Sequence, residues 1–456
     1  MKMKIAVIGA GPSGIAVVKN LLDQGLTDIT VFDRGNQVGG NWVFEADSGH
    51  SSVFETTHII SSKKYSAYHD YPMPAHYPDY PSQALLRVYF QSYADHFGVT
   101  PLVRFETTVQ KCEPLDSGRW EITSCHASSH QVDTETFDYL VVCNGHHWKP
   151  RMPEYPGKFD GQWIHSHEFK RAAPFKGQRV LVIGAGNSAC DVAVETSRIS
   201  QYTDISMRRG YWIVPKYLLG RPADHIHNAM YKLAKYLPTS FSQALFAKLV
   251  LLHTGQHAAY GMQTPDHPIL ATHPTANSEL HYFIGHGEVA VKPDIARLAG
   301  TTVHFVDGTS KDYDTVVCCT GYWITHPFFD KSVLDYSHGK PPLYLKMLPA
   351  DVKNVAFPGL FQPLGCIWPA AELQAKILAR MLVGKWSPPK DLTAAIAHEL
   401  AHPDVRQIDS PRHTITVDYP RFRERLLSEL PKDYVSNRVM PFINPKASKP
   451  GDKLAA

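Results

Sequence analysis

Short, unbroken apolar runs that end at a glycine occur twice in this chain of 456 residues. Residues 4–8 and residues 179–183 are such runs, and each leads into a stretch with helical periodicity. A further apolar strand follows each helix, at residues 28–32 and 205–207. Apolar runs of this length that alternate with helices are typical of parallel strands buried on both faces. The pattern therefore predicts two doubly wound α/β units in one chain.

The order of these patterns places the second unit inside the first. Residues 103–139 are β-rich, and an apolar strand at residues 313–319 ends the second unit before the chain returns to the first. We expect residues 1–157 to form the first part of the first unit, 158–169 a linker, 170–325 the second unit with a helical insertion at about 217–274, and 326–447 the return to the first unit with C-terminal helices. Those helices are expected to wrap the body or to pair subunits as a homodimer.

The first apolar run opens into a glycine fingerprint, Gly9-Ala10-Gly11-Pro12-Ser13-Gly14. In such a turn Gly9 permits the tight bend, Gly11 lets the backbone approach a pyrophosphate, and Gly14 allows the helix to pack closely on the strand. Asp33 ends the next strand, where a carboxylate can accept a hydrogen bond from a ribose hydroxyl. The first unit is therefore predicted to bind a dinucleotide with an unphosphorylated ribose.

The second apolar run opens into a second fingerprint, Gly184-Ala185-Gly186-Asn187-Ser188-Ala189. Arg208 and Arg209 end its second strand, where the first unit has an acid. Guanidinium groups can pair with a 2′-phosphate that a carboxylate would repel, so this unit is expected to prefer NADPH to NADH. One such fingerprint is weak evidence and can be a structural turn, but two copies, each with its strand, helix and ribose-reading residue, predict two Rossmann-like domains.

Two further motifs lie downstream of the first fingerprint. Asp33-Arg34 is followed by Gly39-Gly40-Asn41-Trp42, and residues 159–169 read Phe-Asp-Gly-Gln-Trp-Ile-His-Ser-His-Glu-Phe. The second motif fits the pattern F-x-G-x-x-x-H-x-x-x-F/Y at every fixed position. In these motifs, and over roughly residues 4–385, the chain resembles the flavin-containing monooxygenases. The resemblance implies FAD in the first domain and NADPH in the domain inserted into it.

The resemblance also implies the chemistry. NADPH reduces FAD, dioxygen adds at the flavin C4a position to give a hydroperoxide, and a soft nucleophile such as an amine nitrogen, a thioether sulfur or indole takes one oxygen atom. The cofactor supplies the electrophile, so neither a protein nucleophile nor a metal is required. The sequence contains no H-E-x-x-H, no G-x-S-x-G and no zinc-type cysteine spacing. The expected partners are an amine or sulfide substrate and O2.

Candidate site residues follow from the motifs. The cofactor-binding set is expected to be Gly9, Gly11, Pro12, Ser13, Gly14, Asp33, Arg34, Gly40, Asn41, Trp42, Val109, Gln362, Gly184, Gly186, Asn187, Ser188, Arg208 and Arg209. Asn187 is also assigned to the catalytic set, together with His165, which is expected to position NADP rather than to transfer protons. Gln374 is expected on a helix surface.

Ile60 is a departure from the family. Where well-studied members carry an Asn beside the C4a oxygen adduct, an ungapped reading back from Asp70-Tyr71 gives Ile60, which cannot hydrogen-bond a peroxide. Either Ser61 or Ser62 reaches the flavin instead, or the peroxide is less protected and leaks. We prefer the serines and assign both to the catalytic set.

Two other functions stay open on the sequence. Baeyer-Villiger oxidation of ketones belongs to the same superfamily, but its identifying motif ends in Trp-Pro or Trp-Asp, whereas Phe169-Lys170 stands here. The third hypothesis is a non-oxygenating FAD/NADP protein that senses redox state or acts as an NADPH oxidase. Ile60 keeps this hypothesis open. A disulfide reductase is disfavoured, because there is no C-x-x-C pair.

Composition limits the setting. A net charge of +3 with dispersed Lys and Arg argues against nucleic acid and anionic membranes as partners. The apolar stretch at 244–252 is far shorter than the roughly 20 residues of a spanning helix. Seven cysteines, an odd number, suggest reduced thiols, and the chain starts with a strand rather than a signal peptide, so a cytoplasmic protein is expected. We expect residues 448–456 to be a vector-derived tail.

Overall fold

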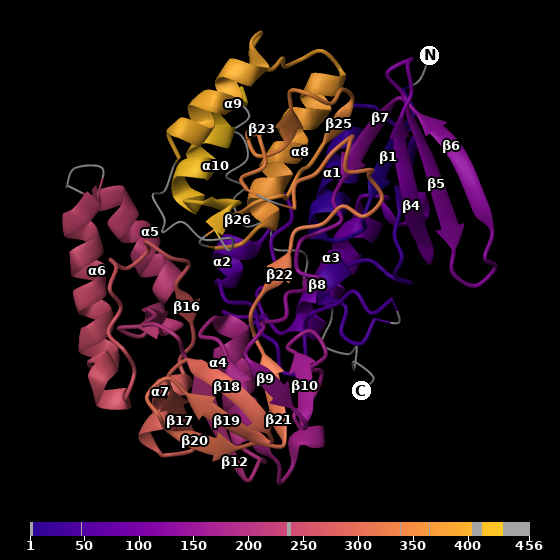
Figure 1. Ribbon diagram of the computed structural model, residues 1–456. Coiled ribbons are helices and arrows are strands. Elements are labelled where there is room, and N and C mark those ends of the chain that lie inside the picture. Colours follow the sequence, from indigo (N-terminus) through magenta and orange to yellow (C-terminus); the bar gives the residue numbers. More distant parts are fainter. Residues whose placement is uncertain are drawn as a thin grey trace, which may run out of the picture.

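Two parallel β-sheets, each covered on both faces, form the body of the protein (Figure 1). The computed structural model describes residues 3–46, 48–234, 239–337, 339–363, 365–403 and 413–431. The unit that holds the first sheet lies above the unit that holds the second sheet in the view of Figure 1. The expected α/β architecture of two doubly wound units is confirmed.

The first sheet has the strand order β25-β7-β1-β2-β3 and is parallel throughout. Its strands are β1 (Ile5–Ile8), β2 (Ile29–Phe32), β3 (Val103–Arg104), β7 (Tyr139–Val142) and β25 (Val355–Ala356). Ile5 and Val7 pack toward the helices α1 (Pro12–Asp23), α3 (Gln83–His96) and α8 (Trp368–Leu382). Ala6 and Ile8 point to the opposite face. This alternation explains why an unbroken apolar run is needed here.

An antiparallel sheet covers that opposite face of the first sheet. It consists of β4 (Thr107–Pro114), β5 (Trp120–His126) and β6 (Val132–Phe137), and it is the β-rich region expected from the sequence. Trp120 is fully buried in the core between the two sheets and donates a hydrogen bond from Nε1 to Lys353 O (3.2 Å). Because β25 follows the second unit in the chain and still pairs with β7, the second unit is inserted into the first.

The second sheet has the strand order β10-β21-β11-β12-β17 and is also parallel. Its strands are β10 (Gln162–His165), β11 (Arg179–Ile183), β12 (Tyr202–Ser206), β17 (Val289–Lys292) and β21 (Thr315–Cys318). The helices α4 (Asn187–Ser197) and α7 (Leu280–Gly285) pack on one face. On the other lie β18 (Ile295–Gly300), β19 (Thr302–Phe305) and β20 (Ser310–Asp312).

The segment 158–169, expected as a linker, is structured within the second unit. It contains β10, the edge strand of the second sheet, and most of β9 (Gly157–Phe159), which pairs with β18. Sequence alone did not show this, because β10 is only four residues long and reaches its neighbour β21 across about 150 residues of chain. The outer limits of the two domains stay predictions.

The expected helical insertion contains α5 (Ala223–Ala234) and α6 (Thr239–Thr254). The helices are bordered by short strand pairs and one turn, namely β13 (Ile213–Val214) with β16 (Thr275–Ala276), β14 (Tyr217–Leu218) with β15 (Arg221–Pro222), and η4 (His257–Tyr260). Figure 1 shows this insertion projecting to one side of the second unit.

The C-terminal helices α9 (Leu392–Ala401) and α10 (Tyr419–Ser428) pack on the body of the first unit, where Ile396 and Leu426 join its core. The remaining short elements are η1 (Gly40–Trp42), α2 (Lys63–Ser66), η2 (Thr100–Leu102), β8 (Lys149–Pro150), η3 (Ala173–Phe175), β22 (Tyr322–Trp323), β23 (Leu343–Tyr344), β24 (Leu348–Pro349), β26 (Gln362–Pro363) and β27 (Thr416–Val417). The expected tail at 448–456 lies outside the described residues. Among the helices that the structure describes, none combines the length and the apolar character that crossing a bilayer requires.

Candidate functional site

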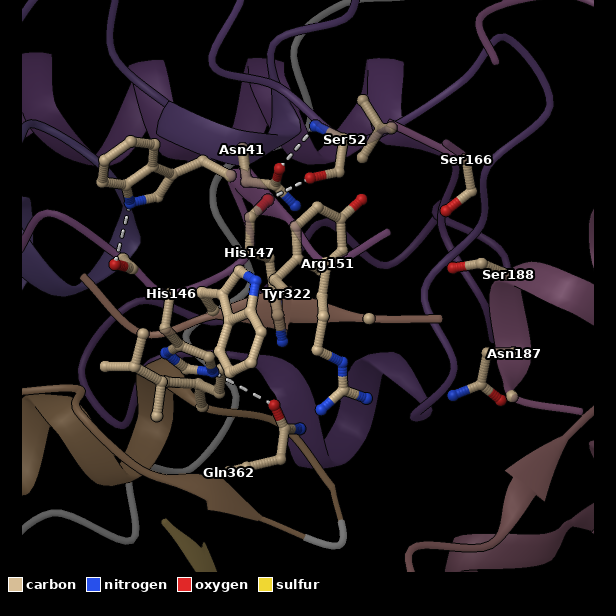
Figure 2. A pocket seen from close by; sticks show the side chains of 18 of the residues that line it. Asn41, Ser52, His146, His147, Arg151, Ser166, Asn187, Ser188, Tyr322 and Gln362 are labelled. Atoms are coloured by element: carbon tan, nitrogen blue, oxygen red, sulfur yellow. Dashed lines mark hydrogen bonds between the residues drawn. The ribbon is translucent and has the colours of Figure 1, made fainter. Parts of the chain in front are cut away.

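A cavity of about 1130 Å³ lies between the two units and is lined by both glycine turns (Figure 2). Most of the residues predicted from the sequence line it. They are Gly9, Gly11, Pro12, Ser13, Asp33, Arg34, Gly40, Asn41, Trp42, Ser61, Val109, Gln362, Gly184, Gly186, Asn187, Ser188, Arg208 and Arg209. Gly14, Ser62 and His165 do not line the cavity. The structure thus brings two distant motifs to one space.

The first turn is built so closely that only glycine fits at two of its positions. Gly9 has φ +102°, and a Cβ atom there would lie 2.5 Å from Cys143 O. A Cβ atom on Gly14 would lie 1.9 Å from Gly9 O. Gly14 therefore lets α1 pack against the strand, and the helix begins at Pro12 with its N-terminal N–H groups at the cavity. Such a cradle fits a pyrophosphate.

Asp33 is held in place by the same turn. Ala10 N donates to Asp33 Oδ2 (2.6 Å) and Gly35 N donates to Asp33 Oδ1 (2.7 Å). Burial raises the pKa of Asp33, although these two hydrogen bonds and Arg34 act in the opposite direction. The guanidinium of Arg34 lies 4.9 Å from the ring of Trp148 and contacts His50 Nδ1. This end of the cavity therefore offers an acceptor and a flat cationic surface.

The segment around η1 forms the next part of the wall. Gly40 has φ +54°, and a Cβ atom there would lie 2.9 Å from Gly11 Cα, so the two backbones touch. Asn41 Oδ1 accepts a hydrogen bond from Ser52 N (2.7 Å). The ring of Trp42 meets that of Trp368 edge to face at 5.7 Å, and both rings line the cavity. The wall combines an oriented amide with a large aromatic surface.

The second turn repeats the geometry of the first. Gly184 has φ +129°, and a Cβ atom there would lie 2.7 Å from Cys319 O. Gly186 caps α4, so the N-terminal N–H groups of this helix also face the cavity. Asn187 Oδ1 accepts from Ala276 N (2.7 Å), and Thr275 Oγ1 donates to Ala185 O (2.6 Å). The segment at 275–276 thereby fixes the turn.

Arg208 and Arg209 follow β12 at the same end of the cavity as the second turn. Arg208 is exposed, and the structure gives it no hydrogen bond or ion pair within the described part of the chain. The guanidinium of Arg209 lies 5.3 Å from the ring of Tyr211. Two cations with spare donors at this position fit a phosphate group.

Ile60 and Ser61 both line the cavity, whereas Ser62 does not. Ser61 Oγ shares a hydrogen bond of 2.8 Å with Ser66 Oγ. Ser62 Oγ is buried without a partner among the described residues, and Ser62 N donates to Asp224 Oδ2 (2.7 Å). Of the two serines considered from the sequence, the structure therefore leaves Ser61 as the one that can reach a ligand.

His165 is a fully buried residue of β10. Its ring lies 5.0 Å from the ring of Tyr322, and its Nδ1 accepts a hydrogen bond from His167 N (3.1 Å). Burial lowers the pKa of His165 to about 4, so it is neutral at physiological pH. This placement supports a packing role at the junction of the units, and the assignment of His165 to the catalytic set stays a prediction.

Gln374 corrects another expectation. Instead of lying on a helix surface it is fully buried, with Nε2 donating to Leu345 O (2.7 Å) and Oε1 accepting from Gly359 N (2.8 Å). Gln362 does line the cavity, and its Oε1 pairs with His146 Nε2 at 3.2 Å (Figure 2). Burial lowers the pKa of His146, which is therefore an uncharged wall residue.

Several lining residues were missed from the sequence. Arg151 points into the middle of the cavity in Figure 2, and its Nη2 donates to Thr320 O (2.7 Å). Arg151 directly follows β8, and Tyr322 begins β22. These two strands pair with each other where the chain passes from the first unit to the second and back again. Nothing in the sequence shows that residue 151 meets Thr320.

Asp191 was missed as well. It lies one helical turn after Asn187, lines the cavity, and its Oδ1 accepts a hydrogen bond from Asn277 Nδ2 (2.7 Å). Burial raises the pKa of Asp191 to about 6, partly offset by Lys216. The i, i+4 spacing from Asn187 was the available signal. No cluster of three or more His, Cys, Asp or Glu side chains suited to a metal ion occurs among the residues described.

Comparison with known proteins agrees with this site. The family model "Flavin-binding monooxygenase-like" matches residues 2–436. Flavin-containing monooxygenase 5 of Rattus norvegicus is 36% identical over 437 residues, which cover 92% of this chain and 81% of that protein. Dimethylaniline monooxygenase (N-oxide-forming) 2 of Cavia porcellus is 33% identical over 450 residues, covering 94% and 83%.

Solved structures show the same fold. S-allyl-L-cysteine S-oxygenase from Allium sativum superposes with a TM-score of 0.68 at 23% identity, covering 94% of this chain and 88% of that chain. A cyclohexanone monooxygenase superposes with a TM-score of 0.69 at 17% identity, covering 95% and 98%. Two glycine cradles on one cavity, a family match over nearly the whole chain and relatives above 30% identity agree. The chain belongs to the flavin-containing monooxygenase family, and it is an FAD- and NADPH-dependent enzyme that oxygenates heteroatom nucleophiles.

Proposed function

We propose that FAD lies along the first glycine turn and NADPH along the second, so that their reactive rings meet inside the shared cavity. On this proposal Asp33 holds the ribose of FAD, the N-terminus of α1 its pyrophosphate, and Trp42 and Gln362 flank its ring. Asn187 and Ser188 contact NADPH, and Arg208 and Arg209 bind its 2′-phosphate. The observation that carries the proposal is that both turns line one cavity of about 1130 Å³.

When bound, NADPH supplies the hydride and FAD the centre at which dioxygen is activated. The residues of this chain bind, orient and shield that centre. The two helix N-termini stabilise phosphate groups, and the paired rings of Trp42 and Trp368 exclude water. Asn41 and Ser61 offer hydrogen-bonding groups in the wall.

The substrate proposed is a neutral amine, a thioether or indole. The support is the lining of the cavity, which includes the apolar side chains Ile59, Ile60, Ile367 and Ile415. An apolar wall favours an uncharged soft nucleophile over a zwitterion, because a buried charge needs a partner. One relative is named for dimethylaniline, an uncharged amine of this kind.

The test is a coupled turnover screen. Purified protein is expected to be yellow with FAD, to consume NADPH and O2, and to yield N-oxides or sulfoxides that gain the mass of one oxygen atom. Lactone or ester products from ketones would instead favour Baeyer-Villiger oxidation. NADPH consumption with no oxygenated product over amine and sulfide panels would refute the proposed substrate class.

Peroxide release is a second activity that one observation favours. Ile60 lines the cavity and cannot hydrogen-bond an oxygen species, so part of the NADPH consumed is proposed to emerge as hydrogen peroxide. The ratio of hydrogen peroxide formed to NADPH consumed measures this share. A ratio near one with every substrate would make the chain an NADPH oxidase.

The setting proposed is the cytoplasm. All seven cysteines are free thiols in the structure, and burial raises the pKa of Cys143 and raises that of Cys319 to about 12, so these cavity thiols stay protonated. Cell fractionation tests the location. The homodimer stays a prediction that sedimentation analysis decides.

A further inference from the structure

Lys170 directly follows the motif at residues 159–169, which we call the identifying motif. Phe169 and Lys170 contact a segment of the first unit. Glu55 N donates to Lys170 O (2.9 Å), and the ring of Phe54 meets that of Phe169 at 5.3 Å. Phe54 and Phe169 are 6% and 1% exposed, so the contact is a buried apolar anchor between the units. Residues 51–55 are thereby fastened to the second unit.

The side chain of Lys170 adds hydrogen bonds to the backbone of this segment. Its Nζ donates to Ser51 O (2.6 Å) and to Val53 O (3.5 Å). Burial lowers the pKa of Lys170, partly offset by Glu45. An ammonium group is well suited to this position because it offers three donors to backbone carbonyl groups, whereas Pro has no donor and Asp only acceptors. Pro and Asp are the residues expected here in Baeyer-Villiger enzymes.

The gripped segment in turn orients a cavity residue. Ser51 Oγ donates to Asn41 O (2.8 Å), and Ser52 N donates to Asn41 Oδ1 (2.7 Å). Ser52 Oγ also donates to His147 O, as Figure 2 shows. Asn41 Oδ1 is thereby occupied, whereas its NH2 group donates no hydrogen bond to the part of the chain that the structure describes, and Asn41 lines the cavity. Lys170 is thus joined to the cavity by two residues.

We propose that Lys170 is a positioning residue, which through Ser51 and Ser52 holds the Asn41 amide with its NH2 group toward the flavin. The proposal rests on the proposed function, since it requires FAD along the first glycine turn. It gives the end of the identifying motif a physical role, because the residue after Phe169 then sets the hydrogen-bonding state of an amide on the other unit. On this proposal, loss of the lysine removes the donors to the carbonyl groups on both sides of Ser52, which loosens the hold of Ser52 N on the amide.

The test measures FAD binding to the full-length apoprotein and the absorption spectrum of the bound flavin. Lys170→Met, which keeps the length of the side chain and removes the donors, is expected to weaken FAD binding about tenfold and to shift the spectrum. Lys170→Arg, which keeps a cationic donor, is expected to restore most of both. Lys176→Met is the matched control, because Lys176 is an exposed lysine outside the cavity; it is expected to leave both readouts unchanged.

A double-mutant cycle with Asn41→Ala tests whether Lys170 affects FAD binding through the Asn41 amide. If Lys170 acts through the amide, Lys170→Met adds less than about twofold in the Asn41→Ala background, whereas additive losses overturn the inference. If Lys170→Met binds FAD as the wild type does while Asn41→Ala binds it more weakly, the inference is overturned but the placement of the flavin is not. Unchanged binding and spectrum in Asn41→Ala overturn the placement of the flavin and the inference with it. If Lys170→Met does not fold, Lys170→Gln is carried through the same cycle.

Discussion

We propose that two arginines at the end of β12 set the preference of the second unit for NADPH over NADH. Arg208→Ala is expected to weaken NADPH binding by about tenfold to a hundredfold, because a charge-assisted hydrogen bond contributes about 1.5–3 kcal/mol, and to leave NADH binding nearly unchanged. Titration of the protein with each nucleotide measures both constants. Arg297→Ala, at an exposed arginine outside the cavity, is the control. Equal losses for NADPH and NADH would contradict the phosphate assignment.

Ser61 is the second residue whose role a single substitution can test. Ser66 Oγ can donate to Ser61 Oγ, which leaves the Ser61 proton for the cavity. Ser61→Ala is expected to raise the share of NADPH electrons recovered as hydrogen peroxide by about fivefold to tenfold, the value of one hydrogen bond. Ser62→Ala removes an unpartnered hydroxyl outside the cavity and serves as the control. A similar rise in both variants would argue against a specific role for Ser61.

At the scale of elements, α1 and α8 are joined by buried charges. Asp70 forms an ion pair with Lys19 of α1 and lies 3.9 Å from Nζ of Lys376 of α8, which also pairs with Glu372; all four side chains are at most 6% exposed. Glu372 Oε2 also accepts hydrogen bonds from His69 N (2.7 Å) and His69 Nδ1 (2.9 Å). The Trp368 ring, which faces the cavity, stands on the first turn of α8. The charges therefore fix the helix that carries part of the cavity wall.

Glu372→Gln is expected to lower the free energy of unfolding by about 3 kcal/mol, because it leaves a buried lysine without its closest partner. Urea unfolding measures the loss, and Glu288→Gln, at an exposed glutamate, is the control. Burial alone would raise the pKa of Glu372, but Lys376 and His69 outweigh it and hold the pKa well below its usual value.

The sign of the pH dependence follows from that lowered pKa. The stabilisation from Glu372 is complete above the unfolded-state pKa of about 4.3 and is lost as the pH falls toward the lower folded-state pKa. The gap in unfolding free energy between the wild type and Glu372→Gln should therefore narrow from pH 5 to pH 3. A gap that stays constant over this range would show that the carboxylate does not contribute through its charge.

Elements also show how far sequence reasoning reaches. Strands β1 and β11, their glycine turns and the helices after them could be predicted, because each depends on residues adjacent in the chain. The burial of Gln374, the place of β10 and the meeting of Arg151 with Thr320 could not, because each depends on segments that approach only after folding. The same holds for Ser61 and Ser62, which adjacent positions in the sequence do not distinguish.

On the scale of the whole molecule, the insertion of one unit into the other creates the active cavity. The chain crosses between the units beside β8 and again beside β22, and these two strands pair with each other (Figure 1). The order of apolar runs and the two glycine fingerprints were enough to predict the insertion and two nucleotide sites. That both glycine turns would face the same space was expected from the family resemblance and its hydride transfer, because the order of the runs does not determine how the two units pack.

The central claim is that the two nucleotides meet within one chain. Anaerobic mixing of the FAD-loaded protein with NADPH, deuterated at the transferred position or not, tests it most directly. The account predicts that the yellow colour bleaches without any added electron mediator. At saturating NADPH the rate of bleaching should be independent of protein concentration, and it should be slower with the deuterated nucleotide. Bleaching that requires a mediator, or whose rate rises with protein concentration, would contradict it.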